Sequence, residues 1–134
     1  MRSDSAMPPL SGVKKIAVLR PNAVGDFVFS LPCLHALRRT YAAAQIVYIG
    51  QAWHAAFLRG RPGPVDTVAV LPPCPGVGAP PQAQIDPQPI RQFIDVMRAS
   101  QFDLAVQIYG GGRYANPFIQ RCDARFAIGM KAAR

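Results

Sequence analysis

Short runs of apolar, mostly β-branched residues alternate along this chain with longer segments of helical periodicity, and this alternation restricts the fold more than any other feature. Such runs predict strands, whereas apolar residues spaced about 3.6 apart predict amphipathic helices. Runs that are almost wholly apolar are typical of parallel strands covered by helices on both faces. The alternation therefore predicts an α/β fold of successive βαβ units. The expected strands are residues 15–19, 45–49, 67–71, 104–108 and 125–128.

Three segments between these runs have helical spacing. The first begins after Asp26, and Pro32 within it predicts either a bend or a later start capped by Ser30. The second covers residues 52–59 and the third residues 90–99. In the first helix we expect Arg38 and Arg39 to face solvent. Side chains expected to face the core are Phe27, Leu31, Leu34, Tyr41, Trp53, Phe57, Ile90, Phe93, Ile94 and Met97.

The length of 134 residues suits one domain with a single core. Residues 1–12 are small, polar and proline-bearing, which predicts a disordered N-terminal tail before a domain at 13–134. Residues 72–89 hold seven of the fourteen prolines, so we expect a long irregular loop there. That loop is either a solvated connection or a linker or lid.

The chain is strongly basic, with a formal net charge of +8 from fifteen Lys and Arg against seven acidic residues, all Asp. This balance favours an anionic partner: nucleic acid, a phosphorylated glycolipid or an acidic membrane surface. Because the basic residues are scattered rather than gathered in a tract or on one helix, a nucleic-acid partner is disfavoured.

The sequence lacks the motifs of several well-known kinds of functional site. The loop after the first run has one glycine where a dinucleotide fingerprint needs three, and neither a P-loop nor a G-x-S-x-G elbow is present. Neither histidine has a partner at metal-ligand spacing, and no two cysteines form a C-x-x-C pair, so we expect no metal. We expect the three cysteines to be reduced thiols in a cytoplasmic protein. The two histidines are His35 and His54, and the three cysteines are Cys33, Cys74 and Cys122.

Gly25-Asp26 directly follows the first apolar run and its loop, where a strand should lead into a helix. Ligands of open α/β sheets bind beyond the carboxyl ends of the strands, so Asp26 is a candidate working residue. The structural alternative is that Asp26 only stabilises the first helical turn, whose free N–H groups favour acidic residues. Spacing alone leaves both roles open.

A second loop of the same kind follows the fourth run and contains Gly110, Gly111, Gly112 and Arg113. Glycines let a ligand approach the backbone, and a guanidinium offers a forked donor to phosphate or carboxylate. A flexible turn is the alternative. The pair Asn116-Pro117 after it predicts a helix cap followed by proline at the first helical position.

The residues of the first run, Gly25-Asp26 and the following Phe27-Val28-Phe29-Ser30-Leu31-Pro32 resemble the opening of glycosyltransferase family 9, the bacterial heptosyltransferases and their relatives. Two later segments, Phe102-Asp103-Leu104-Ala105-Val106-Gln107 and Ala124-Arg125-Phe126-Ala127-Ile128-Gly129, are similar to the fourth-strand and fifth-strand segments of that family. The resemblance covers most of residues 14–130.

The resemblance implies a GT-B enzyme, in which one Rossmann-like half binds the sugar acceptor and the other binds a nucleotide sugar, usually ADP-heptose. This chain is similar to the acceptor half, so the donor-binding domain would be absent or supplied by a partner subunit. Asp26 would be the general base of an inverting, metal-independent transfer of heptose or a related sugar to lipopolysaccharide or another cell-surface glycan. An anionic acceptor would place the protein in the cytoplasm or at the cytoplasmic face of the inner membrane.

The residues that we expect to bind the substrate are Arg20, Asn22, Gly25, Gly110, Gly111, Gly112 and Arg113. Arg20 matches a basic residue common in the family, with either a binding or a purely structural role, and Asn22 lies where the family has a Ser-rich loop. A second interpretation stays open: a non-catalytic Rossmann-like module that binds an anionic glycan or a partner protein through its basic surface.

Overall fold

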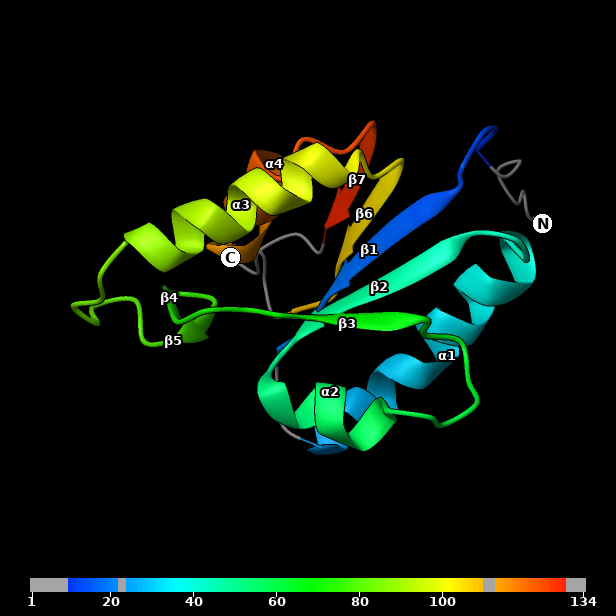
Figure 1. The fold of residues 1–134 in the computed structure, drawn as a ribbon, viewed down its shortest axis with the longest axis horizontal. Helices are drawn as coiled ribbons and strands as arrows, with labels where there is room; N and C mark the ends of the chain where they lie inside the picture. Colours follow the sequence, from blue (N-terminus) through cyan, green and yellow to red (C-terminus); the bar gives the residue numbers. More distant parts are fainter. Residues whose placement is uncertain (1–9, 22–23, 110–112, 130–134) are drawn as a thin grey trace.

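The computed structural model describes residues 10–21, 24–109 and 113–129, with the backbone alone at residues 24–26 and 29. Its centre is a parallel sheet with strand order β3-β2-β1-β6-β7 (Figure 1). The predicted parallel sheet is confirmed, and each strand begins and ends within one residue of the expected range. The five strands are β1 (Lys15–Leu19), β2 (Gln45–Gly50), β3 (Thr67–Val70), β6 (Leu104–Gln107) and β7 (Phe126–Gly129).

Helices cover both faces of the sheet, as the apolar runs predicted. Figure 1 shows α1 (Val24–Thr40) and α2 (Ala52–Leu58) on one face, and α3 (Gln88–Ser100) and α4 (Ala115–Arg121) on the other. Because successive side chains of a strand point to opposite faces, β1 contributes to two cores. Ile16 and Val18 pack on the α1 side, and Ala17 and Leu19 pack on the α3 side.

The first helix begins three residues earlier than expected and runs unbroken through Pro32. Ser30 is therefore not its cap: the Ser30 hydroxyl donates to the carbonyl of Phe27, 2.6 Å away, inside the helix. Phe27 and Leu34 are buried, as predicted. Arg38 does not face solvent freely. Its guanidinium donates to the carbonyl of Ala44 at 2.6 Å and to the Asp66 carboxylate at 2.6 Å, so it joins α1 to the residue before β2 and to the segment before β3.

The inward face of α2 differs from the prediction. His54 is the buried residue of this helix, at 1% exposure, whereas Phe57 is 43% exposed. The Trp53 ring is partly buried and stacks on the His54 ring with 3.7 Å between centroids. The helix has only seven residues, so a small rotation about its axis decides which side chain is covered. In α3, by contrast, Ile90, Ile94 and Met97 face the core as the periodicity predicted.

The last strand departs from the expectation of full coverage. All four residues of β7 are exposed, and Ile128 reaches 53%. Because β7 pairs with β6 along one side only, it forms one edge of the described sheet. The apolar sequence of this segment therefore predicted a strand correctly but did not predict its burial.

The proline-rich segment is more ordered than expected. It contains two short parallel strands, β4 (Cys74–Pro75) and β5 (Gly78–Ala79), and α3 begins at Gln88, inside the range expected as loop. Gly76 and Gly78 both have φ of +82°, a conformation that side chains rarely adopt, so glycine allows the tight turn between these strands.

Residues 10–12, which we expected as the end of a tail, contact the domain. The amide of Leu10 donates to the Tyr41 hydroxyl at 3.1 Å, and Arg125 donates to the carbonyl of Gly12 at 3.2 Å. The three cysteines are free thiols. Within the described part of the chain, no helix has both the length and the apolar character needed to cross a membrane.

Candidate functional site

The candidate site lies at the carboxyl edge of the sheet, between β1 and β6. After β1 the chain enters α1 on one face, and after β6 it enters α4 on the opposite face. The connections leaving these two neighbouring strands therefore diverge at the point where the strand order reverses, which is the topological position of the ligand-binding crevice in open α/β sheets. Ligands of open α/β sheets bind at this point. Asp26 and the glycine-rich loop were predicted from sequence for these same two connections.

Arg20 bridges the two connections. Its Nη1 donates to the carbonyl of Ile108, the first residue after β6, and its main-chain amide donates to the carbonyl of Ile49 in β2 at 3.3 Å. The side chain is partly buried. The Arg20 guanidinium thus contacts the connection after β6. That Arg20 binds the acceptor stays a prediction.

Two residues of the β2 side hold the start of the β1–α1 connection. The Tyr48 hydroxyl donates to the carbonyl of Arg20 at 2.7 Å, and Gln51 Nε2 donates to the carbonyl of Pro21 at 3.0 Å. Gln51 is itself held, because its amide donates to His54 Nδ1 at 2.8 Å. Sequence reasoning did not single out Tyr48 or Gln51. Their distance of about thirty residues from the loop they hold leaves no local signal.

His54 lies beneath this corner in an aromatic cluster with Phe27, Tyr48 and Trp53. Burial lowers the pKa of His54 to about 4, so the ring is neutral at neutral pH. With Nδ1 accepting from Gln51, the neutral ring carries its proton on Nε2, and among the described residues Nε2 has no hydrogen-bond partner. The sequence analysis excluded His54 as a metal ligand but did not predict its complete burial.

Gly25 and Asp26 are the second and third residues of α1, so both lie in its first turn at the carboxyl edge. The structure describes only the backbone of these residues. Their position agrees with both roles considered for Asp26, that of a base facing the crevice and that of an acidic residue stabilising the first turn. Asn22, Gly110, Gly111 and Gly112 lie outside the described residues.

Arg113 is exposed, with its guanidinium 5.4 Å from the centre of the Tyr114 ring. The prediction that Asn116 caps the next helix is wrong. Tyr114 occupies the cap position, and Asn116 is the second residue of α4. Asn116 is instead drawn into a contact with the sheet, since its Oδ1 accepts from Gln107 Nε2 at 2.7 Å.

Gln107 is a functional candidate that sequence reasoning overlooked. It ends β6 at 1% exposure, and its Oε1 accepts the amide of Tyr109 while its Nε2 donates to Asn116. One buried amide therefore fixes both ends of the connection that carries Arg113. The available signal was a polar residue in an otherwise apolar run, which in a buried strand requires a polar partner.

The segment that follows β3 crosses this edge, and we refer to residues 71–79 as the strap. The amide of Gly78 donates to the Tyr109 hydroxyl at 3.3 Å. A Cβ at Gly76 would lie 2.4 Å from Tyr114 Cγ, so the Tyr114 ring rests directly on the glycine backbone. The strap thus joins the outer strand β3 to the connection after β6. Between the strap and the connections that follow β1 and β2 is a pocket of about 190 Å³.

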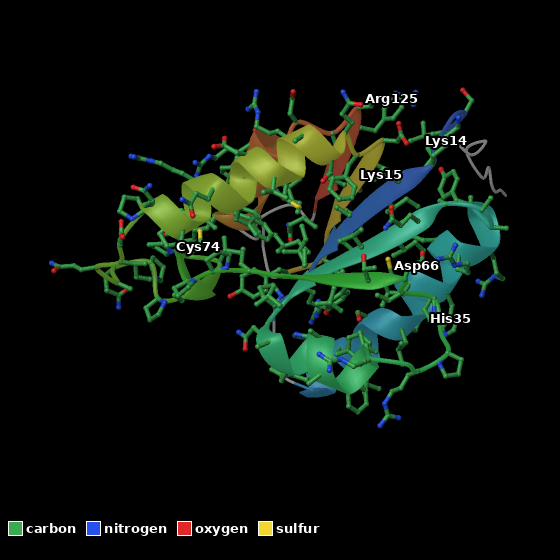
Figure 2. The ribbon with its side chains drawn as sticks, viewed as in Figure 1. Lys14, Lys15, His35, Asp66, Cys74 and Arg125 are labelled. Carbon is green, nitrogen blue, oxygen red and sulfur yellow. The ribbon has the colours of Figure 1, made fainter. Side chains whose placement is uncertain are left out.

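A cluster of charged side chains lies away from the carboxyl edge of the sheet. Figure 2 shows Lys14, Lys15 and Arg125 at the amino end of the strands, and Asp103 lies among them through hydrogen bonds. Among the described residues, no group of three or more His, Cys, Asp or Glu side chains is arranged to hold a metal ion. The described part of the site therefore presents backbone, amide and phenol groups, together with the guanidinium groups of Arg20 and Arg113.

These features define the class of the module: a doubly wound, Rossmann-like α/β unit with its crevice between β1 and β6. Its fold is similar to the crystal structure of a glycosyl transferase family 9 protein from Veillonella parvula DSM 2008, with a TM-score of 0.67 and 17% sequence identity. The match covers 89% of this chain and 32% of the other, so this chain spans about a third of that protein's length.

The similarity to this glycosyl transferase structure agrees with the resemblance found from sequence motifs, and it establishes the shared fold. No protein-family model matches the chain, and no curated protein matches it.

Proposed function

We propose that this chain is the acceptor-binding part of an inverting glycosyltransferase, which transfers heptose or a related sugar from a nucleotide sugar to lipopolysaccharide or another cell-surface glycan. The observation that carries the proposal is the fold match to a glycosyl transferase family 9 structure, together with Asp26 in the first turn of α1 beside the crevice. A donor such as ADP-heptose would be bound by a second unit outside these residues.

In the proposed reaction, Asp26 takes the proton from an acceptor hydroxyl. The resulting oxygen nucleophile forms a bond to the anomeric carbon of the donor sugar, and the bond from that carbon to the nucleoside diphosphate breaks. Attack opposite the leaving group inverts the anomeric configuration. The first turn of a helix favours the ionised carboxylate that this step requires. Arg113, exposed beside the crevice, would bind an anionic group of the acceptor.

The other predicted site residues have supporting roles in this proposal. Arg20 holds the two connections together through the carbonyl of Ile108, while Asn22, Gly25 and the glycines at 110–112 would face the acceptor. An anionic glycolipid acceptor would bring the protein to the cytoplasmic face of the inner membrane, and the formal charge of +8 favours that attraction.

The test compares Asp26→Asn with Asp95→Asn in the protein expressed from its whole reading frame. Both changes remove one carboxylate charge, but Asp95 is exposed on α3, on the other face of the sheet. With ADP-heptose and a lipopolysaccharide core as acceptor, release of nucleoside diphosphate should fall by about 10²–10⁴-fold in Asp26→Asn, the usual contribution of a general base. Asp95→Asn should retain wild-type turnover.

Two results would contradict the proposal. If Asp26→Asn turns over like Asp95→Asn, Asp26 is not the base. If the wild type and both variants transfer no sugar, but the wild type binds an acidic glycan with an affinity that falls as salt rises, the chain is a binding module without catalysis.

A further inference from the structure

We infer that the pocket beneath the strap binds one uncharged pyranose ring of the acceptor. This inference rests on the proposed function, because it assigns a sugar of the acceptor to a particular place at the carboxyl edge. The anionic groups of the acceptor would then lie outside this pocket, on the side of Arg113. The argument uses the position, lining and size of the pocket.

The pocket lies beside the β1–α1 connection that leads to Asp26. One wall is Pro21 from that connection, and a second is Gln51 from the connection after β2. Leu71, Pro72 and Val77 belong to the strap and close the other side. A ring seated here is therefore next to the crevice between β1 and β6, where an acceptor hydroxyl must lie to reach a base on α1.

The chemistry of the lining suits the two surfaces of a sugar ring. Leu71, Val77 and the prolines provide apolar walls against which the C–H face of a pyranose can pack. Gln51 Nε2 donates one N–H to the carbonyl of Pro21 and has a second N–H that can donate to a sugar hydroxyl. The described residues that line this pocket include no charged side chain. An ionised ring would lose hydration there without gaining a counter-charge, so the lining selects an uncharged ring.

The size of the pocket limits the occupant to a single ring. Its volume is about 190 Å³, below the roughly 300 Å³ at which pockets for drug-sized ligands begin. Binding of an isolated monosaccharide should accordingly be weak, with a dissociation constant in the millimolar range. In the proposed enzyme this site would contribute selectivity for the ring rather than most of the acceptor affinity.

The backbone of Gly78 offers a way to fill the pocket without moving its walls. A Cβ at Gly78 would lie 3.7 Å from Leu71 Cδ2 and 3.7 Å from Pro21 Cγ, both of which are ordinary contacts with lining residues. Its φ of +82° is tolerated by asparagine better than by most residues. Gly78→Asn therefore places a side chain where the sugar ring would sit.

Gly60 provides a matched control. Its φ is +70°, and a Cβ added there would meet nothing within 4 Å. Gly60→Asn thus carries a similar backbone cost at the end of α2 but leaves the pocket beneath the strap unchanged. The milder Gly78→Ala serves as a second pocket variant, and thermal melting establishes that each variant is folded before binding is measured.

The experiment is a titration of the full protein with three compounds, followed by the amide NMR signals of Gln51, Val77 and Gly78. Methyl α-D-glucopyranoside is the uncharged ring, methyl α-D-glucuronide adds a carboxylate, and cyclohexanol keeps only the apolar ring. We expect saturable shifts with the glucoside alone. Gly78→Asn should weaken its binding at least tenfold, Gly78→Ala by a smaller factor, and Gly60→Asn by less than twofold.

The inference is overturned if the glucuronide or cyclohexanol binds at least as tightly as the glucoside, if the three signals do not move, or if Gly78→Asn binds the glucoside like Gly60→Asn. These results are independent of catalysis, so they separate the two proposals. Loss of transfer in Asp26→Asn together with unchanged glucoside binding in Gly78→Asn would refute the pocket assignment and leave the glycosyltransferase proposal standing.

Discussion

Replacing Asp103 by asparagine tests how the amino end of the sheet is held together. Asp103 precedes β6, and its Oδ2 accepts the amides of Lys14 at 2.9 Å and Lys15 at 3.0 Å. Its Oδ1 accepts from Arg125 Nη1 at 3.1 Å. One carboxylate therefore joins the start of β1 to the segment before β7, two parts of the chain that lie together in Figure 2.

The loss of stability that we expect from Asp103→Asn follows from these contacts. A hydrogen bond to a charged group contributes about 1.5–3 kcal/mol, and an exposed ion pair less than about 1 kcal/mol. The Asp103 side chain is 16% exposed and Arg125 is 50% exposed, so the two amide bonds dominate. Asparagine keeps one acceptor oxygen but loses the charge. We expect Asp103→Asn to lower the free energy of unfolding by about 2 kcal/mol, or about 6–8 °C in melting temperature.

The loss should depend on pH in a defined direction. The amide of Lys14 is the largest cause that lowers the pKa of Asp103 below its ordinary value, and Arg125 and the amide of Lys15 add to it. As pH falls, the unfolded chain therefore takes up this proton before the native protein does. The contribution of Asp103 is complete above about pH 5 and is lost as pH falls through its native pKa.

Urea unfolding of the wild type, Asp103→Asn and the exposed control Asp95→Asn at pH 7 and pH 3 measures this contribution. The difference between wild type and Asp103→Asn should be smaller at pH 3, while Asp95→Asn should follow the wild type at both pH values. A difference that does not change between pH 7 and pH 3, or one below about 0.5 kcal/mol at pH 7, is the size expected of an ordinary surface substitution and would refute the reasoning.

Two further predictions concern the carboxyl edge. Because the buried His54 has a native pKa of about 4, the protein should lose roughly 2 kcal/mol of stability as pH falls from about 6.5 to 4. In urea titrations, His54→Asn should remove most of this loss. An unchanged pH dependence in that variant would exclude His54 as its source. Gly76→Ala would push a methyl group against the Tyr114 ring and detach the strap, so limited proteolysis should cut residues 72–89 several-fold faster. Gly60→Ala is the control, and equal cutting of both variants would show that the Tyr114 contact does not hold the strap.

The strands were predictable because their signal is local. A parallel strand buried on both faces must be apolar at nearly every position, and the runs at β1, β2 and β6 meet this requirement. Their carboxyl ends lie along one edge, so the region of the site was predictable as well. Exposure at β7 was not, because it depends on which neighbours pack on the strand and not on its own residues.

The contacts that shape the candidate site were mostly hidden from sequence reasoning. Gln107 could be noticed as a polar residue in an apolar run, but its partner Asn116 was interpreted as a helix cap. Arg38 was assigned to solvent because helical periodicity places it outward, yet it donates to the Asp66 carboxylate and to the carbonyl of Ala44, just before β2. In each case the deciding partner belongs to another element.

The sequence itself determined the order of the five strands of the parallel sheet and the position of Asp26 in the first helical turn. It did so through periodicity and the few residues that start and end helices. Tertiary structure alone decided that Arg20 reaches the carbonyl of Ile108, that the strap rests on Tyr114 and that a pocket remains beneath it. The physical reason is the separation along the chain of the residues that interact. Periodicity reports the environment of a segment, whereas a hydrogen bond or a pocket requires groups far apart in the chain to meet at a defined distance.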